Sequence, residues 1–381
     1  MSAPMETRSG RLGEIVQFFL RLGLTAFGGP AAHLMLMERE AVERRGWLSR
    51  EQFLDLVGAC NLLPGPGSTQ VAMALGYRRR GWPGLIVAGV CFIVPACLAT
   101  LALAWAYVRF GSVSWVQGLL YGAKPVMVAI LLQAIWNLGR TAFRRWSLGA
   151  LGVAALAAAW LGAPPIAVLL ASGGVLLCAC WAKTRFQSTQ AIAFLPAATA
   201  AGTATAGASL ASVALLFLKL GVVVFGSGYV LLAFLKADLV DRLHWITEPQ
   251  LIDAVTAGQI TPGPVFATAT FVGFLLHGWP GAAVATVSIF LPSFVMAGMV
   301  GALAGRIRQS ELAAAFLDGV NAAAVAVMAA VAWPLGRAAI VDGSTAGIGF
   351  AGLILLLVLR INATWVVLLA ALLGALLRGL H

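Results

Sequence analysis

Two short stretches decide the fold class of this chain. Residues 61–70 read Asn-Leu-Leu-Pro-Gly-Pro-Gly-Ser-Thr-Gln, and residues 259–268 read Gln-Ile-Thr-Pro-Gly-Pro-Val-Phe-Ala-Thr. Proline ends a helix that precedes it, and the second proline of each Pro-Gly-Pro suits the first turn of a helix that follows it. Each stretch is therefore predicted to separate two half-helices.

The two stretches belong to an internal duplication. Between residues 15–66 and residues 213–264, 17 of the 52 aligned positions are identical at an offset of 198, without a gap. After one residue is lost, an offset of 197 holds as far as residues 138–140, which match residues 335–337. Such self-similarity predicts two copies of one structural unit. We expect an N-terminal cytoplasmic segment (1–11), a first repeat (12–182), a linker (183–209) and a second repeat (210–381). The alternative that residues 188–209 form an additional span stays open.

The composition places both repeats in a membrane. The 381 residues are 61% hydrophobic and 10% charged, with a mean hydropathy of +0.93, whereas roughly a quarter of the residues of soluble domains are charged. A span needs about 20 residues, so the length leaves room for about 10 to 13 spans. The chain is therefore predicted to be an all-α, polytopic membrane protein.

The net charge of +11 reads as a topology signal and not as a nucleic-acid surface. In the first repeat, basic residues gather at junctions that fall on one side, at positions 78–80, 140–145 and 183–185, which marks that side as cytoplasmic. The matching junctions of the second repeat are poor in positive charge. We therefore predict two inverted-topology repeats with Pro-Gly-Pro broken or re-entrant helices, a cytoplasmic N-terminus and an external C-terminus.

The broken helices are candidates for an anion site. Free backbone N–H groups and the positive end of a half-helix attract negative charge, and a bilayer tolerates such backbone where it lines a cavity. Ser68, Thr69 and Gln70 add side-chain donors, while the second repeat has Val-Phe-Ala after its Pro-Gly-Pro. The first repeat is therefore favoured as the side that touches substrate. A purely structural proline kink is the alternative.

Charged residues inside apolar runs are further candidates. Arg21 and Lys219 occupy equivalent positions in the first helix of each repeat, shortly before glycine-containing breaks. A basic residue at this depth serves as a counter-charge for an anion, or its side chain extends to the interface. Lys124 is alone in the apolar run 113–139 and is predicted to face a cavity. Asp55 and Asp253 are candidate proton carriers, although helix capping explains the polarity of their segments equally well.

The predicted substrate-binding residues come from both repeats. They are Arg21, Gly28, Gly29, Asn61, Pro64, Gly65, Pro66, Gly67, Ser68, Thr69, Gln70, Lys124, Lys219, Gly226, Ser227, Gln259, Thr261, Pro262, Gly263 and Pro264. No phosphate loop, zinc motif or nucleophile elbow occurs at a suitable junction. We therefore expect no catalytic residue, metal or cofactor, and no nucleic-acid partner.

The whole pattern resembles the long-chain, two-domain form of the chromate ion transporter family. The resemblance rests on Phe-Gly-Gly-Pro at residues 27–30, Arg-Gly-Trp-Leu at residues 45–48 and the two Pro-Gly-Pro stretches, and it covers nearly the whole chain. It implies export of chromate across the bacterial inner membrane, driven by the membrane potential or a proton gradient, which confers chromate resistance.

Sulfate, an isosteric dianion, is an expected competitor. A transporter of sulfate or another oxyanion is the alternative function, and an intramembrane enzyme is an alternative from a different class. The expected partners are chromate and the lipid bilayer. The sequence leaves the oligomeric state open, a homodimer included.

Overall fold

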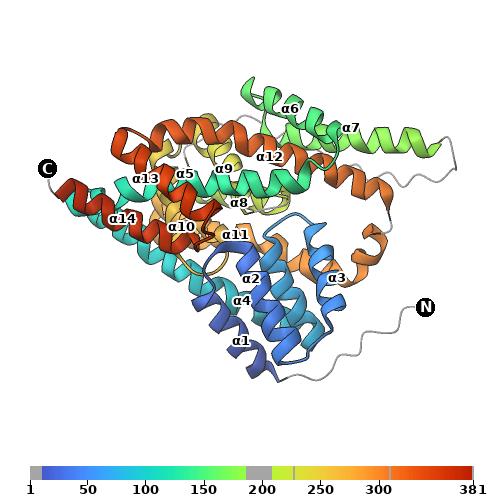
Figure 1. Cartoon of the computed structure of the whole chain (residues 1–381). Coiled ribbons are helices and arrows are strands. Elements are labelled where there is room, and N and C mark those ends of the chain that lie inside the picture. The colour runs from blue at the N-terminus through green and yellow to red at the C-terminus, as the bar shows by residue number, and fades with distance from the viewer. Residues whose placement is uncertain (1–10, 186–207, 226–227, 309, 380–381) are drawn as a thin grey trace.

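The computed structural model describes residues 11–185, 208–225, 228–308 and 310–379 (Figure 1), and none of these residues forms a strand. The two repeats give matching series of helices. The first series is α1 (Leu12–Thr25), α2 (Gly29–Glu38), η1 (Arg39–Arg44), α3 (Arg50–Asn61), α4 (Gly67–Phe110), α5 (Ser114–Ala142), α6 (Trp146–Trp160) and α7 (Pro165–Arg185). The second is α8 (Leu210–Val223), α9 (Val230–Leu235), η2 (Lys236–Arg242), α10 (Glu248–Ile260), η3 (Val265–Ala267), α11 (Thr268–Arg308), α12 (Glu311–Ala339), α13 (Gly343–Leu357) and α14 (Ala363–Gly379).

These helices confirm the predicted all-α membrane protein. By length and composition, five stretches of the described chain are apolar enough to cross a membrane: α4, α5, Pro165–Ala182 of α7, Val265–Val300 and α12. Four more apolar helices have 17 residues or fewer: α6, α8, α13 and most of α14. Five is fewer than the number expected from chain length, because these shorter helices do not reach the length of a full span and because α4 and α11 each count as one stretch although each contains two helices.

The long helices α4 and α11 each contain a sharp reversal. Arg80 and Gly81 leave helical geometry with φ/ψ of −149°/26° and 61°/−147°, and the equivalent pair in α11 has nearly the same angles. Residues eight apart in a straight helix are about 12 Å apart. A Cβ on Gly76 would nevertheless collide with the backbone of Gly84. Each long helix is therefore a tight hairpin of two helices, and the two copies share one geometry.

The repeats are related by a pseudo-two-fold axis. Val128 on α5 lies 3.8 Å from the position of a Cβ on Gly336 of α12, and Val325 on α12 lies 3.7 Å from that of Gly139 on α5. The repeat offset exchanges one pair for the other, and the contacts run in opposite order along the two helices. The equivalent helices α5 and α12 are thus antiparallel. Since both are long enough to cross a membrane, the two repeats cross it in opposite directions.

The last two helices of each repeat pack on the other repeat. Figure 1 shows α6 and α7 along α12, and α13 and α14 beside α5. Gly122 on α5 touches the backbone of Ala370 on α14, and the equivalent Gly319 on α12 touches the backbone of Ser172 on α7. Small residues at these positions allow the close approach of helices. The larger of the two buried hydrophobic clusters consequently draws its residues from both repeats.

Candidate functional site

The helix breaks of the two repeats are hydrogen-bonded to each other. The backbone N–H of Gly65 donates to the carbonyl of Val224 at 2.6 Å, and that of Gly263 donates to the carbonyl of Ala26 at 3.0 Å. Ala26 and Val224 follow the ends of α1 and α8. Both glycines have positive φ, +114° and +94°, in a region that other residues rarely adopt. The four breaks therefore form one centre at which the repeats interlock, here called the paired breaks.

Local sequence fixes the half-helices on either side of this centre. Ser49 caps α3 in a capping box with Gln52, and Thr247 does the same for α10 with Gln250. Helix α3 then ends at Asn61, and α4 begins only after Pro66. The five residues between them are not helical, because Pro64 and Pro66 cannot continue a helix from the preceding turn.

A buried histidine connects the breaks of the first repeat. His33 Nε2 lies 3.2 Å from the carbonyl oxygen of Ala26, and its Nδ1 lies 3.2 Å from Ser68 Oγ. A carbonyl can only accept, so the neutral ring donates from Nε2 and accepts the Ser68 hydroxyl proton at Nδ1. His33 has no exposed surface. It thus joins the end of α1 to the start of α4, and sequence reasoning did not select it.

Several buried polar atoms around the paired breaks have no hydrogen-bond partner within the described part of the chain. They are Thr69 Oγ1, Gln70 Oε1, Gln259 Nε2 and Ser293 Oγ. Ser293 and Gln70 both lie against Gly65, since a Cβ there would be 3.1 Å from Ser293 Oγ and 2.7 Å from Gln70 Nε2. Buried polar groups are nearly always paired in proteins. Buried hydroxyl and amide groups without a partner can form hydrogen bonds with a polar ligand.

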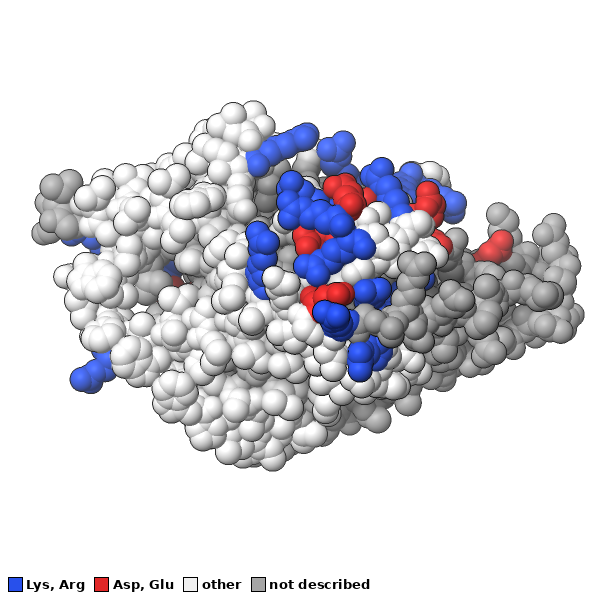
Figure 2. Space-filling view, turned by 90° about the horizontal axis from the view of Figure 1, so that it is seen from below, with Lys and Arg blue, Asp and Glu red and all other residues white. Residues whose placement is uncertain are grey.

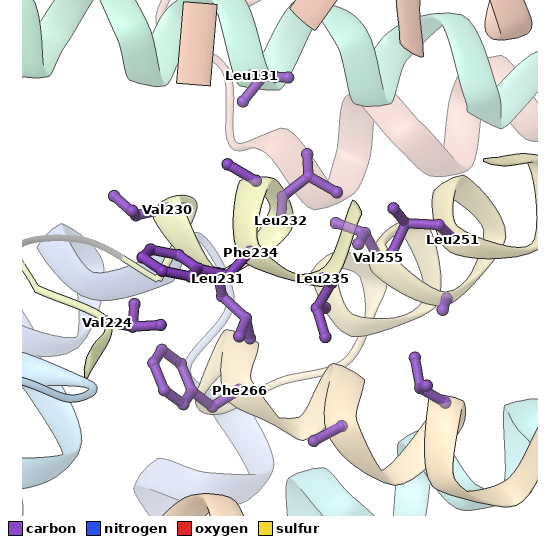
Figure 3. Close-up of a cluster of buried hydrophobic side chains, with 14 of the residues drawn as sticks. Leu131, Val224, Val230, Leu231, Leu232, Phe234, Leu235, Leu251, Val255 and Phe266 are labelled. Atoms are coloured by element: carbon purple, nitrogen blue, oxygen red, sulfur yellow. The ribbon is translucent and has the colours of Figure 1, made fainter. Parts of the chain in front are cut away.

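The breaks of the second repeat are surrounded by apolar side chains. Figure 3 shows Val224, Leu231 and Phe266 within a buried hydrophobic cluster. Leu231 occupies the position that His33 has in the first repeat. The link that His33 makes between the breaks of the first repeat therefore has no counterpart at Leu231.

An ion pair with a buried carboxylate also links the two repeats. Lys124 Nζ on α5 lies 3.2 Å from Asp253 Oδ1 on α10, and the Tyr107 hydroxyl of α4 donates to Asp253 Oδ2 at 3.1 Å. Asp253 is 3% exposed. The triad occurs once, because the repeat partner of Lys124 is Asn321 and the partner of Asp253 is the exposed Asp55.

The two basic residues of the first helices lie apart from these buried groups. Arg21 is exposed and lines a surface cleft with residues of η1. Lys219 forms an ion pair of 2.8 Å with Asp238. The structure therefore does not gather Arg21 and Lys219 with the polar atoms of the paired breaks.

Three further predicted residues, Gly28, Gly29 and Thr261, lie at contacts between the two repeats. Gly28 lies against Asn362, whose amide donates to the Phe27 carbonyl at 3.3 Å, and Gly29 lies close to the Tyr229 hydroxyl. Thr261 is within 3.2 Å of Thr100 Oγ1 in the other repeat. Gly226, Ser227 and residues 188–207 of the segment 188–209 lie outside the described residues. In the described part of the chain, no three His, Cys, Asp or Glu residues gather as metal ligands.

Tyr107, Thr100 and Ser293 were also missed by sequence reasoning. The only available signal was a polar residue within an apolar helix, and for Ser293 its place directly after Pro292, which the duplication repeats as Pro95.

Comparison with known proteins gives the family. A family model described as "Chromate transporter" matches residues 13–178 and again residues 211–375. The chain belongs to the chromate transporter family. A chromate transport protein of Cupriavidus metallidurans is 32% identical over 95% of this chain and 92% of its own length. A probable chromate transport protein of Synechococcus elongatus is 32% identical over 90% and 89%.

A chromate transport protein of Pseudomonas aeruginosa is 31% identical over 82% of this chain and 78% of its own length. No solved structure matches the chain. The family resemblance found in the sequence is thus confirmed, and both repeats of the chromate transporter architecture are present in one polypeptide.

Proposed function

We propose that this protein transports chromate across the membrane and binds the dianion at the paired breaks. The observation that carries the proposal is the pair of hydrogen bonds from Gly65 to Val224 and from Gly263 to Ala26. They join the breaks of both repeats into one centre, where buried hydroxyl and amide groups have no partner among the residues that the structure describes. Membership of the chromate transporter family supports chromate as the substrate. Sulfate, with the same tetrahedral shape and charge, is the second candidate.

The direction that we propose is export from the bacterial cytoplasm across the inner membrane, with chromate resistance as its consequence. Moving one charge through 100 mV is worth roughly 2.3 kcal/mol, so a dianion that leaves an inside-negative cell gains roughly 4.6 kcal/mol. The membrane potential alone is therefore a sufficient driving force.

A proton contributes through the Lys124–Asp253 pair. While Asp253 is ionised, it is the anionic partner of Lys124. Protonation of Asp253 removes this partner, and Lys124 is then available to a passing dianion. Asp253 is buried, Lys124 is partly buried, and the pair joins α5 of one repeat to α10 of the other. Proton binding and anion binding are coupled because both act on one lysine.

The test is transport in proteoliposomes that contain the full chain. Counterflow of labelled chromate is measured with sulfate, molybdate or phosphate as competitor, at two pH values. Removing the unpartnered hydroxyls with Thr69→Val and Ser293→Ala is expected to lower the initial rate at least tenfold. Thr141→Val, which removes an exposed hydroxyl bonded only to its own helix, is the matched control and keeps the rate. Equal rates in all three variants would show that the paired breaks do not bind the substrate.

A further inference from the structure

The cleft around Arg21 is the second polar feature of the first repeat. It has a volume of about 200 Å³ between α1 and the α2–η1 segment. Its lining combines the apolar side chains of Phe18, Leu22 and Leu36 with a cluster of charged ones, Arg21, Arg39, Glu40, Arg44 and Arg45. We call these charged residues and their apolar floor the arginine cleft. Figure 2 shows the concentration of basic and acidic residues on one part of an otherwise mostly uncharged face.

The arginine cleft carries a net positive charge. Glu40 accepts from Arg45 at 2.8 Å and from Arg44 at 3.3 Å. Burial alone would raise the pKa of Glu40, but the bonds from these two arginines hold it below its usual value, so the carboxylate is ionised at neutral pH. Four arginines against one carboxylate leave a charge of +3, and no ion pair is recorded for Arg21 or Arg39 within the described residues.

The same place in the second repeat carries less positive charge. Asp238, the equivalent of Glu40, accepts from both Lys219 and Arg242 at 2.8 and 3.1 Å. The positions of Arg39 and Arg45 are held by Ala237 and Leu243. Two cations therefore face one carboxylate, and the surplus charge of the first repeat comes from the two extra arginines.

The surroundings of the arginine cleft indicate where its ligand comes from. The neighbouring side chains Leu20, Leu24 and Met35 are 40%, 55% and 64% exposed, which is the pattern of a surface that faces lipid. At the other side, the guanidinium groups of Arg45 and Arg79 stack on Trp47, 5.5 and 5.0 Å from the ring centroid. Tryptophan and arginine together are typical of the headgroup level of a bilayer.

We propose that the arginine cleft binds the phosphate headgroup of an anionic phospholipid, with Arg21 and Arg39 as its direct partners and the acyl chains along Leu20, Leu24 and Met35. Arginine holds phosphate oxygens in paired hydrogen bonds. The apolar floor of the cleft suits the glycerol and first methylenes of a lipid better than it suits a hydrated inorganic ion. This lipid site is separate from the chromate site proposed at the paired breaks.

The test is native mass spectrometry of the full chain in detergent, titrated with phosphatidylglycerol or with phosphatidylcholine of the same acyl chains. Arg21→Gln with Arg39→Gln is expected to weaken the tightest phosphatidylglycerol site roughly 30-fold, since each basic residue near the surface contributes about 1 kcal/mol. Phosphatidylcholine binding is expected to be unchanged. Arg109→Gln with Arg337→Gln removes the same charge from two exposed arginines outside the cleft and is expected to leave phosphatidylglycerol binding intact.

Three results would overturn the proposal. An equal loss in both double variants would show an effect of bulk charge only. Displacement of the lipid by millimolar chromate, sulfate or phosphate would show a site for free oxyanions. Unchanged phosphatidylglycerol binding in Arg21→Gln with Arg39→Gln would show that the cleft holds no lipid, provided that the variant keeps the wild-type thermal unfolding midpoint, which its two exposed positions lead us to expect.

Discussion

The backbone N–H of Gly263 is bonded to the carbonyl of Ala26, 237 positions earlier in the chain, at 3.0 Å. The same carbonyl lies 3.2 Å from His33 Nε2. One oxygen thus receives a donor from each repeat, and a displacement of the second repeat's Pro-Gly-Pro is transmitted directly to the histidine of the first. In an alternating-access transporter, a contact of this kind connects the binding centre to the relative motion of the repeats.

Gly263→Ala is expected to destabilise the protein strongly. The residue has a φ of +94°, and a Cβ there would lie 2.7 Å from the Cβ of Ala96. Backbone strain of about 1–2 kcal/mol is added to an overpacking cost of about 1–3 kcal/mol. Thermal unfolding in detergent measures the sum. Gly162→Ala has a similar φ of +86° and open space around it, so its smaller effect isolates the strain. Equal midpoints in the two variants would contradict close packing at Gly263.

His33→Leu is expected to abolish most transport while the protein still folds. The substitution introduces the residue that the second repeat carries at Leu231, which is buried in an apolar cluster. The link between Ala26 and Ser68 is lost, and we expect at least a tenfold lower initial rate of chromate uptake into proteoliposomes. Size-exclusion profiles and unfolding midpoints show whether the variant is intact. Wild-type rates in a well-folded variant would argue against a role for His33.

Removing one partner of the Lys124–Asp253 pair is expected to cost more stability than removing both. Lys124→Met leaves the Asp253 carboxylate buried without its cation, which costs about 3–5 kcal/mol. Adding Asp253→Leu is expected to restore most of this loss and to abolish the dependence of transport on pH. The exposed pair Arg50–Glu38 serves as the control, because such pairs contribute about 0–1 kcal/mol. Additive losses in the double variant would show that the pair is not coupled.

Equivalent loops of the two repeats are expected to lie on opposite sides of the membrane. Arg145 precedes α6, and its repeat partner Asp342 precedes α13. In a chain whose five native cysteines are replaced, Arg145→Cys and Asp342→Cys are labelled with an impermeant maleimide in sealed, oriented vesicles. Each cysteine should react from one side only, Arg145→Cys from the cytoplasmic face. Labelling of both from the same face would refute the inverted arrangement.

Local signals explain what could be predicted from the sequence. The prolines mark the ends of half-helices, and the constant offset of 198 and then 197 residues identifies the repeats. The unequal distribution of arginine indicates the inversion, which agrees with the antiparallel packing of α5 and α12. Each of these signals is present in a short segment or in a comparison of two segments. The family and the helix order followed from them.

Contacts between distant segments explain what could not be predicted. A single histidine in an apolar helix does not indicate that it bonds to the carbonyl of Ala26, and Lys124 is 129 positions from its partner Asp253. Arg21 and Lys219 are equivalent in sequence, yet Arg39, the η1 arginine that lines the cleft with Arg21, is replaced by Ala237 in the second repeat. Their different surroundings result from side chains that the duplication did not preserve.

The packing of each repeat's last helices on the other repeat has a consequence for synthesis. A chain that enters the membrane from its N-terminus delivers α7 before α12, the helix on which α7 packs, has been made. The first repeat therefore cannot reach its final packing by itself. The contact between Ser172 on α7 and Gly319 on α12 forms only after α12 has been synthesised. During that interval the faces of α6 and α7 that will pack on α12 remain uncovered by protein, and they are buried only when the second repeat has been inserted.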